Sequence, residues 1–300
     1  MPIAPGSLSV WFTVPTSIGV TVRPLLTVIT PCLNAAATIS DTLRSVAAAT
    51  ALLAEHGHQL EHWIIDGGSI DSTLEKACRH AERFPFCRIK EGVGGGVYRA
   101  MNVGLRLAGG HFTHILNADD IIIDPKGYCA LVRDGLNQRA LILLSSIVYF
   151  RRPTYTLRHS WDVQPLPGDR NYWQGLLRSG LHYPHPGFFA QTDLYRTEGF
   201  DERYSLSADY KLMQSLLLRP DLAMRVSVCT SHLVGMAEGG ATAGLAAILR
   251  GSRQLHAINR ELGIRDSYWR RYPRKLWRRL QPFQPPVLAG RRLLPPASNQ

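Results

Sequence analysis

Four apolar runs in the first 120 residues each end in a polar or glycine-rich stretch, and this repetition limits the folds open to the chain. β-Strands are predicted at residues 25–31, 61–66, 87–90 and 111–116. Helices are predicted after the first three, at residues 34–50, 69–84 and 96–110. Short apolar strands that alternate with amphipathic helices predict an α/β fold. Its central sheet should be mostly parallel, with helices on both faces.

The polar strand exits are predicted to form one ligand-binding cleft. They are residues 31–34, 66–69, 91–96 and 117–120. Parallel strands end along one edge of a sheet, and ligands of open α/β sheets bind outside that edge. We therefore expect these four segments, which lie far apart in sequence, to come together.

The second half of the chain has fewer clear patterns, so its elements and the domain bounds are predicted in less detail. A further strand is predicted at 140–150, loops and a β-ribbon that cover the cleft at 151–187, and a helix beginning in "SADYKLMQSLLLR". Residues 1–24 are predicted to be a loose leader and residues 25–249 the main domain. Within that domain, 25–123 would bind the donor and 124–249 the acceptor. Residues 250–300 form the tail.

The positive charge of the chain belongs to this tail. The net charge is +11, and residues 250–300 contain twelve Lys or Arg and two Asp or Glu. The main domain is nearly neutral, which argues against nucleic acid as a partner. No apolar stretch is long enough to span a membrane, and five scattered cysteines without a CxxC pair favour a reducing, cytoplasmic compartment.

The tail is predicted to be partly helical and partly disordered. In residues 267–280, Arg and Lys alternate with Trp, Tyr and Leu. That pattern suits an anionic membrane surface, and a solvated face packed on the domain is the alternative.

Two adjacent carboxylates, Asp119 and Asp120, follow the fourth strand. Unpaired carboxylates are costly to bury, and two together repel unless a cation lies between them and a ligand. Mg²⁺ and Mn²⁺ take oxygen ligands from carboxylates and substrate phosphates. The pair therefore predicts either a metal-diphosphate site or acidic residues at a helix start, before Asp124 and Pro125.

Five segments in order resemble the inverting nucleotide-sugar glycosyltransferases of family 2, which have the GT-A fold. They are "TVITPCLNAAATISDTLRSV", "IIDGGSIDST", "GGGVYRAMNVGLRLAGGHFTHILNADD", "HPGFFAQTDLYRTEGFDERYSLSADYKLM" and "EGGAT". Together they cover roughly residues 25–245. The resemblance is strongest to enzymes of bacterial exopolysaccharide and O-antigen assembly. It implies an α/β, Rossmann-like GT-A domain that precedes the basic tail.

The resemblance also implies a role for each matching residue. Asp209 would be the general base, Asp119 with Asp120 would hold Mn²⁺ or Mg²⁺ on the diphosphate, and His185 and Asp201 would lie on the acceptor side. A helix cap is the alternative for Asp209. The donor nucleotide or sugar would contact the remaining matching residues: Pro31, Asn34, Asp66, Gly68, Ser69, Arg99, Asn102 and Asn117.

The chain departs from the family pattern at two positions, Gly94 and Arg99, where relatives often carry aspartate. Arg99 could neutralise a phosphate or be a solvated helix residue. The resemblance as a whole implies a metal-assisted transferase that moves a sugar from a nucleoside-diphosphate donor to a glycan or lipid-linked acceptor. Surface polysaccharide synthesis, in the cytoplasm or on the inner face of the membrane, would be its setting. A degenerate nucleotide or lipid-surface binding module and a nucleotidyltransferase are the alternatives.

Overall fold

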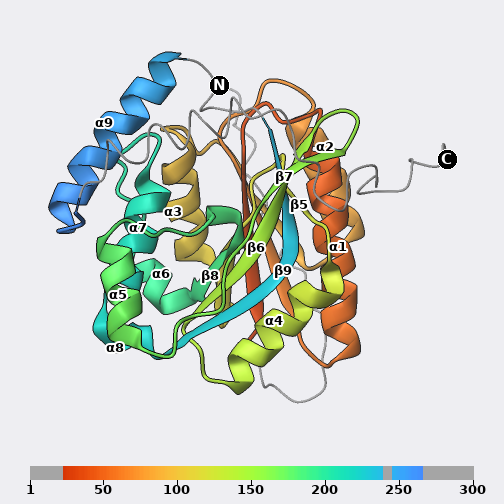
Figure 1. The fold of residues 1–300 in the computed structure, drawn as a ribbon. Helices are drawn as coiled ribbons and strands as arrows, with labels where there is room; N and C mark the ends of the chain where they lie inside the picture. Colours follow the sequence, from red (N-terminus) through yellow and green to blue (C-terminus); the bar gives the residue numbers. More distant parts are fainter. Residues whose placement is uncertain (1–22, 239–244, 266–300) are drawn as a thin grey trace, which may run out of the picture.

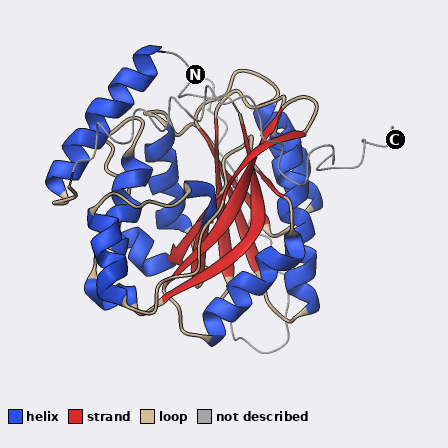
Figure 2. Cartoon of the chain, in the orientation of Figure 1, coloured by secondary structure: helices blue, strands red, loops and turns tan. Residues whose placement is uncertain are grey.

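A computed structural model describes residues 23–238 and 245–265, and it confirms the predicted α/β class. A curled sheet lies between two groups of helices (Figures 1 and 2). The predicted segments 267–280 and 239–242 and nearly all of the predicted leader lie outside the described residues.

The first half of the chain forms four parallel strands and a short edge strand. The parallel strands are β1 (Leu26–Cys32), β2 (Leu60–Asp66), β3 (Cys87–Lys90) and β4 (Phe112–Ile115), and the short β5 (Ile121–Ile122) is antiparallel to a strand of the second half. The helices of the first half are α1 (Ile39–Glu55), α2 (Thr73–Arg83), α3 (Val97–Leu107) and α4 (Pro125–Asn137). β1 pairs in parallel with both β2 and β4, and β2 pairs in parallel with β3.

The second half extends this sheet. Its strands are β6 (Ile142–Arg151), β7 (Thr156–Trp161), β8 (Phe188–Gln191) and β9 (Val226–Ala237). Its helices are α5 (Arg170–Arg178), α6 (Thr192–Glu198), α7 (Ala208–Leu217), α8 (Pro220–Ala223) and α9 (Leu245–Glu261). The strand order is β3-β2-β1-β4-β8-β6-β9-β5, with β7 on β6. β8 is antiparallel to both of its neighbours, and β9 is parallel to β6.

Both faces of the sheet are covered by helices. Because successive side chains of a strand point to opposite sides, each strand contributes residues to two cores. On β1, Ile29 packs into a core with α3 and α5–α7, and Val28 packs into a second core with α1 and α4. Phe188 and Phe189 of β8 divide between the same two cores. In Figure 1, α1, α2 and α4 accordingly lie on one side of the sheet, and α3 and α5–α9 lie on the other.

Two local predictions from the sequence are wrong. Residues 151–187 contain the predicted β-ribbon, formed by β6 and β7, but they also contain the helix α5, where loop was predicted. The helix α2 begins at Thr73 and not at residue 69 as predicted, and Asp71 accepts a hydrogen bond from the Thr73 backbone N–H at 3.0 Å. Asp124, and neither Asp119 nor Asp120, caps α4, through the Gly127 N–H at 3.0 Å.

Helix α9 runs across residues 249 and 250, where the sequence analysis divides the domain from the tail. Its residues pack on α7, since the phenol of Tyr210 donates to Asn259 Oδ1 at 2.7 Å and Ile258 is fully buried. The described part of the tail is therefore helical and docked on the acceptor half.

Candidate active site

The β1 and β2 exits are held together around the carboxylate of Asp66. This side chain is only 2% exposed, and its Oδ2 accepts the backbone N–H groups of Gly68 and Ser69 at 2.9 and 3.0 Å. The Ser69 hydroxyl donates to the other oxygen, Oδ1. Gly68 has φ +94°, a conformation that residues with a Cβ rarely adopt. Asp66 therefore fixes the shape of the turn at 67–69.

Asn34 connects the same turn to the β1 exit. Its backbone lies in the left-handed region, with φ +49°, where asparagine is better tolerated than most residues. Its N–H donates to Ser69 Oγ at 2.9 Å, and its Oδ1 accepts the Ile70 N–H at 3.0 Å. Pro31 is buried in β1 beside Ile65 of β2. The structure thus brings together Pro31, Asn34, Asp66, Gly68 and Ser69. They belong to residues 31–36 and 66–71, which we call the double loop.

The glycine-rich segment after β3 lies against this double loop. The Val93 N–H donates to the backbone oxygen of Asp66 at 2.8 Å. Arg99, in the first turn of α3, is exposed and folds back over the segment: a Cβ on Gly95 would lie 2.6 Å from Arg99 Cδ. A positive charge is therefore placed directly above the loop, where the family pattern has aspartate.

The carboxylates of Asp119 and Asp120 differ in their surroundings. Asp120 is 1% exposed, and its two oxygens accept the Ala237 N–H at 3.1 Å and the Asn117 side-chain amide at 3.3 Å. Asp119 is half-buried and forms no side-chain hydrogen bond with another described residue. Burial raises the pKa of both carboxyls, and the charge of Asp119 raises that of Asp120 further. Asp119 is thus the carboxylate available to a ligand.

Sequence reasoning missed the residue that fixes the Asp119 backbone. Arg152, directly after β6, donates from Nη2 to the backbone oxygen of Asp119 at 3.0 Å and from Nη1 to Asp41 Oδ2 at 2.6 Å. Asp41 belongs to α1, and Tyr155 also donates to its Oδ2. No local pattern marks Arg152, because its partners are distant in sequence.

These residues fit a divalent cation that is shared with a diphosphate. Within residues 23–238 and 245–265, no cluster of three or more His, Cys, Asp or Glu side chains is arranged to hold a metal ion by itself. Mg²⁺ and Mn²⁺ sites of this type need only one or two carboxylates, since waters and substrate phosphates complete the shell. A carboxylate pair with raised pKa values, in which the Asp119 side chain forms no hydrogen bond with another described residue, meets that requirement.

Asp209 lies in the first turn of α7, is half-buried, and contacts the helix α3. The phenol O–H of Tyr98, on α3, donates to Asp209 Oδ1 at 2.9 Å. His185 lies close enough for the carboxylate to act on its charge, although burial is the larger effect and lowers the pKa of this imidazole. His185 Nε2 is buried and has no hydrogen-bond partner among the described residues.

Two predicted site residues contact other parts of the structure. The Asn102 amide holds the backbone of Phe200, accepting its N–H at 2.8 Å and donating to its oxygen at 2.9 Å. Asp201 pairs with Arg203 at 2.6 Å and with Lys211 at 2.7 Å, and these cations lower its pKa. Both residues shape the 199–202 loop, and Asp201 lines a pocket of about 310 Å³ there.

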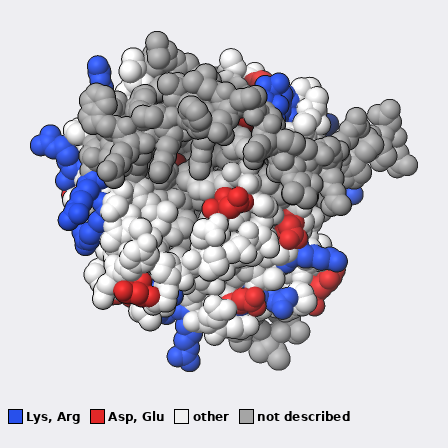
Figure 3. All heavy atoms as spheres, viewed as in Figure 1, with Lys and Arg blue, Asp and Glu red and all other residues white. Residues whose placement is uncertain are grey.

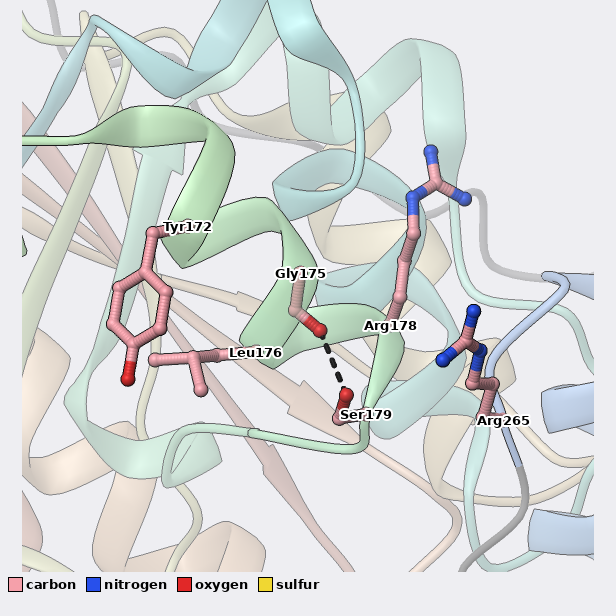
Figure 4. A pocket seen from close by; sticks show the side chains of 6 residues that line it. All are labelled: Tyr172, Gly175, Leu176, Arg178, Ser179 and Arg265. Atoms are coloured by element: carbon pink, nitrogen blue, oxygen red, sulfur yellow. Dashed lines mark hydrogen bonds between the residues drawn. The ribbon is translucent and has the colours of Figure 1, made fainter.

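The pocket drawn in Figure 4 contains none of the predicted residues. It has a volume of about 340 Å³ and lies on α5, with Tyr172 and Leu176 on one side and the guanidinium groups of Arg178 and Arg265 on the other. In the view of Figure 3, basic side chains gather at the left edge, where Figure 1 places α9, and the centre is mostly uncharged. None of the described helices combines the length and apolar character needed to cross a bilayer.

Comparison with known proteins identifies the family of the chain and supports its fold. The sequence matches the model of glycosyl transferase family 2 over residues 27–202, more than half of the chain. A PGL/p-HBAD biosynthesis glycosyltransferase of Mycobacterium tuberculosis is 28% identical over 207 residues, which cover 67% of this chain and 73% of the relative.

Solved structures share the fold at low sequence identity. Staphylococcus aureus TarS in complex with UDP-GlcNAc superposes with a TM-score of 0.56 at 16% identity, covering 78% of this chain and 65% of TarS residues 1–349. The mannosyltransferase PcManGT of Pyrobaculum calidifontis, in complex with GDP-Man and Mn²⁺, gives a TM-score of 0.55 at 19% identity, covering 82% of this chain and 66% of PcManGT. The chain thus belongs to glycosyl transferase family 2, and it is a glycosyltransferase of the GT-A fold.

Proposed function

We propose that this glycosyltransferase moves a sugar, with inversion and metal assistance, from a nucleoside-diphosphate donor to a hydroxyl of a glycan or lipid-linked acceptor. The observation that carries the proposal is the pair of adjacent carboxylates at the β4 exit, of which Asp119 is half-buried and Asp120 is buried. Their raised pKa values reflect the cost of taking two neighbouring carboxylates out of water. A bound cation would offset that cost.

The donor nucleotide would lie on the double loop of residues 31–36 and 66–71. This loop is fixed by hydrogen bonds before any ligand binds, through Asp66 and Asn34. Arg99 would contact a phosphate from above the glycine segment. TarS and PcManGT are described with UDP-GlcNAc and with GDP-Man, respectively, which supports a nucleoside-diphosphate sugar as the donor class.

Asp119 would bind Mn²⁺ or Mg²⁺, and Asp120 and Asn117 would keep the 117–120 loop in shape. When bound, the ion neutralises negative charge that develops on the departing diphosphate. PcManGT and the M. tuberculosis glucosyl-3-phosphoglycerate synthase are described with Mn²⁺. The chain's own contribution is to hold Asp119 in place through Arg152.

Asp209 would accept the proton of the acceptor hydroxyl as that oxygen attacks the anomeric carbon. The new bond forms between the acceptor oxygen and the anomeric carbon, and the bond from this carbon to the diphosphate oxygen breaks. A general base must lie within hydrogen-bond reach of the proton that it accepts. The position of Asp209 at the start of α7, bonded to a residue of the donor-side helix α3, supports this role.

The acceptor would be lipid-linked and would be used in glycolipid or surface polysaccharide synthesis. The mycobacterial relative is named for the biosynthesis of PGL and p-HBAD, which supports the lipid class. An enzyme of this kind would work in the cytoplasm, at the inner face of the membrane. Residues 267–280 would then contact anionic lipid.

A thermal-shift panel tests the donor and metal parts of the proposal. UDP, GDP, dTDP, CDP and CMP are each added with and without Mn²⁺. Ligand at about 100 times its dissociation constant adds roughly 2.7 kcal/mol to the free energy of unfolding. Stabilisation by one nucleoside diphosphate only when Mn²⁺ is present is the expected result, and it names the donor to use in a transfer assay. Stabilisation by none of them would contradict the proposal.

A further inference from the structure

The phenol of Tyr98 links the donor side of the fold to the carboxylate proposed as the general base. Tyr98 lies two residues after the glycine segment 94–96, on α3, and is only 8% exposed. Its O–H donates to Asp209 Oδ1 at 2.9 Å across a separation of 111 residues. The backbone of Ala208 and Asp209 also lies close enough to lower the pKa of the phenol, against the larger effect of burial. Tyr98 therefore contacts the first turn of α7.

The ring of Tyr98 is held in place from the side. It stacks on Phe200, with the ring centroids 5.6 Å apart and the planes at 23°. Asn102, one helical turn after Tyr98 on the same face of α3, binds both the N–H and the carbonyl of Phe200. Tyr195 also stacks on Phe200, with the ring centroids 6.2 Å apart. Because these contacts fix the ring, the phenol O–H keeps its direction.

Tyr98 acts as a hydrogen-bond donor and not as a proton source. Burial raises its pKa far above the ordinary value, and the adjacent Asp209 charge raises it further. The phenol thus keeps its proton at neutral pH. Of the two Asp209 oxygens, Oδ1 is occupied by this bond, and Oδ2 forms no side-chain hydrogen bond with the described residues.

We propose that Tyr98 is a positioning residue for Asp209: its phenol holds Oδ1 so that Oδ2 is presented to the acceptor hydroxyl. This inference rests on the proposed function of Asp209. The proton of the acceptor passes to Oδ2, and the phenol proton stays on Tyr98. Because Tyr98 follows the glycine segment directly, the same helix would set the position of the base relative to the donor.

The test compares Tyr98→Phe with Tyr210→Phe. Tyr210 lies beside Asp209, is 6% exposed, and donates its phenol proton to Asn259 at 2.7 Å. Both variants lose one buried hydroxyl, but only Tyr98→Phe frees Asp209. The readout is nucleoside diphosphate release from UDP-glucose, UDP-GlcNAc or GDP-mannose, whichever the wild type consumes with Mn²⁺. We expect kcat of Tyr98→Phe to fall about 10-fold to 100-fold, as for a misplaced catalytic group, with a donor KM within about twofold of wild type. Tyr210→Phe should keep its kcat.

A second comparison separates positioning from general damage. If Tyr98 acts through Asp209, then adding Tyr98→Phe to Asp209→Asn should not lower the residual rate further. Equal losses in both backgrounds, or a kcat of Tyr98→Phe that matches wild type, would overturn the inference. An inactive wild type with every donor would instead overturn the proposed function. In that case the melting temperatures of the wild type, of Tyr98→Phe, of Asp209→Asn and of the double variant still decide whether the two side chains are coupled.

Discussion

Arg152 joins Asp41 to the backbone of Asp119. Its Nη1 lies 2.6 Å from Asp41 Oδ2, and its Nη2 lies 3.0 Å from the Asp119 carbonyl oxygen. The side chains of Arg152 and Asp41 are 16% and 10% exposed, so this ion pair is shielded from water. One guanidinium thus connects α1, the β6–β7 ribbon and the proposed metal loop.

Removing this guanidinium should destabilise the protein in a pH-dependent way. Arg152→Met leaves Asp41 with the exposed Arg44 as its remaining cation and should cost about 2–4 kcal/mol in the free energy of unfolding. Despite the opposing effect of burial, hydrogen bonds from Tyr155 and Arg152 and the nearby positive charges lower the pKa of Asp41. The stabilisation is therefore present above the ordinary carboxyl pKa and is lost as the pH falls below it. Urea titrations at pH 7 and near pH 3 should show a difference between variant and wild type that shrinks in acid.

The matched control for Arg152→Met is the double variant Asp41→Asn with Arg152→Met. Neutralising both partners removes the uncompensated carboxylate. The double variant should therefore lose less stability than Asp41→Asn and Arg152→Met lose in sum when each is measured alone. Additive losses would show that the pair is not coupled.

Asp119→Asn should have opposite effects on the free and the ligand-bound protein. Burial raises the pKa of Asp119, so its ionised form costs stability once the pH exceeds that value. Asparagine removes this cost, and the melting temperature of the metal-free variant should rise by a few degrees at pH 8, given roughly 2–4 °C per kcal/mol for a domain of this size. The rise should vanish in acid, where wild-type Asp119 is protonated.

The same variant should lose the stabilisation that Mn²⁺ and a nucleoside diphosphate give together, since an amide is a weaker ligand for hard cations. Asp124→Asn, which changes an aspartate that caps α4 instead, is the control. Unchanged Mn²⁺-dependent stabilisation in Asp119→Asn would rule out Asp119 as the ligand.

The local parts of this fold could be predicted from the sequence, and the long-range parts could not. The strands β1–β4 lie within one or two residues of their predicted bounds, since apolar runs and turn residues are local signals. Helix α5 was missed because it buries only Trp173 and Leu177, and prolines precede it. Strand β9 alternates poorly between buried and exposed residues in its middle, so its pattern indicates no strand.

In the candidate site, too, local features could be predicted from the sequence and long-range contacts could not. The position of Asp66 at the end of β2 follows from its neighbours in sequence. Three donors to its carboxylate come from Gly68 and Ser69 of the same turn, whereas the fourth, the Cys32 thiol at 3.7 Å, belongs to another strand. The roles of Arg152 and Tyr98 depend on partners 33 and 111 residues away. No spacing rule reaches that far without the sheet topology.

Asp209→Asn should separate binding from turnover. If Asp209 accepts the acceptor proton, the amide keeps the size of the side chain but loses the base. General base catalysis contributes about 10²-fold to 10⁴-fold, so kcat should fall by that factor. The donor lies on the β1 and β2 loops in our proposal, so its affinity, measured by calorimetry with Mn²⁺ present, should stay within about twofold. A drop in donor affinity as large as the drop in kcat would assign Asp209 to the donor instead.

Two substitutions of Asn34 should separate backbone strain from hydrogen bonding in the donor loop. Asn34→Gly and Asn34→Ala both remove the bond from Ile70 N–H to Oδ1. Both must adopt φ +49°, but only alanine has a Cβ, for which this conformation costs roughly 1–2 kcal/mol. Asn34→Ala should therefore melt lower than Asn34→Gly, and it should bind the stabilising nucleoside diphosphate more weakly. Equal melting temperatures and affinities would mean that the left-handed conformation at residue 34 relaxes at no cost.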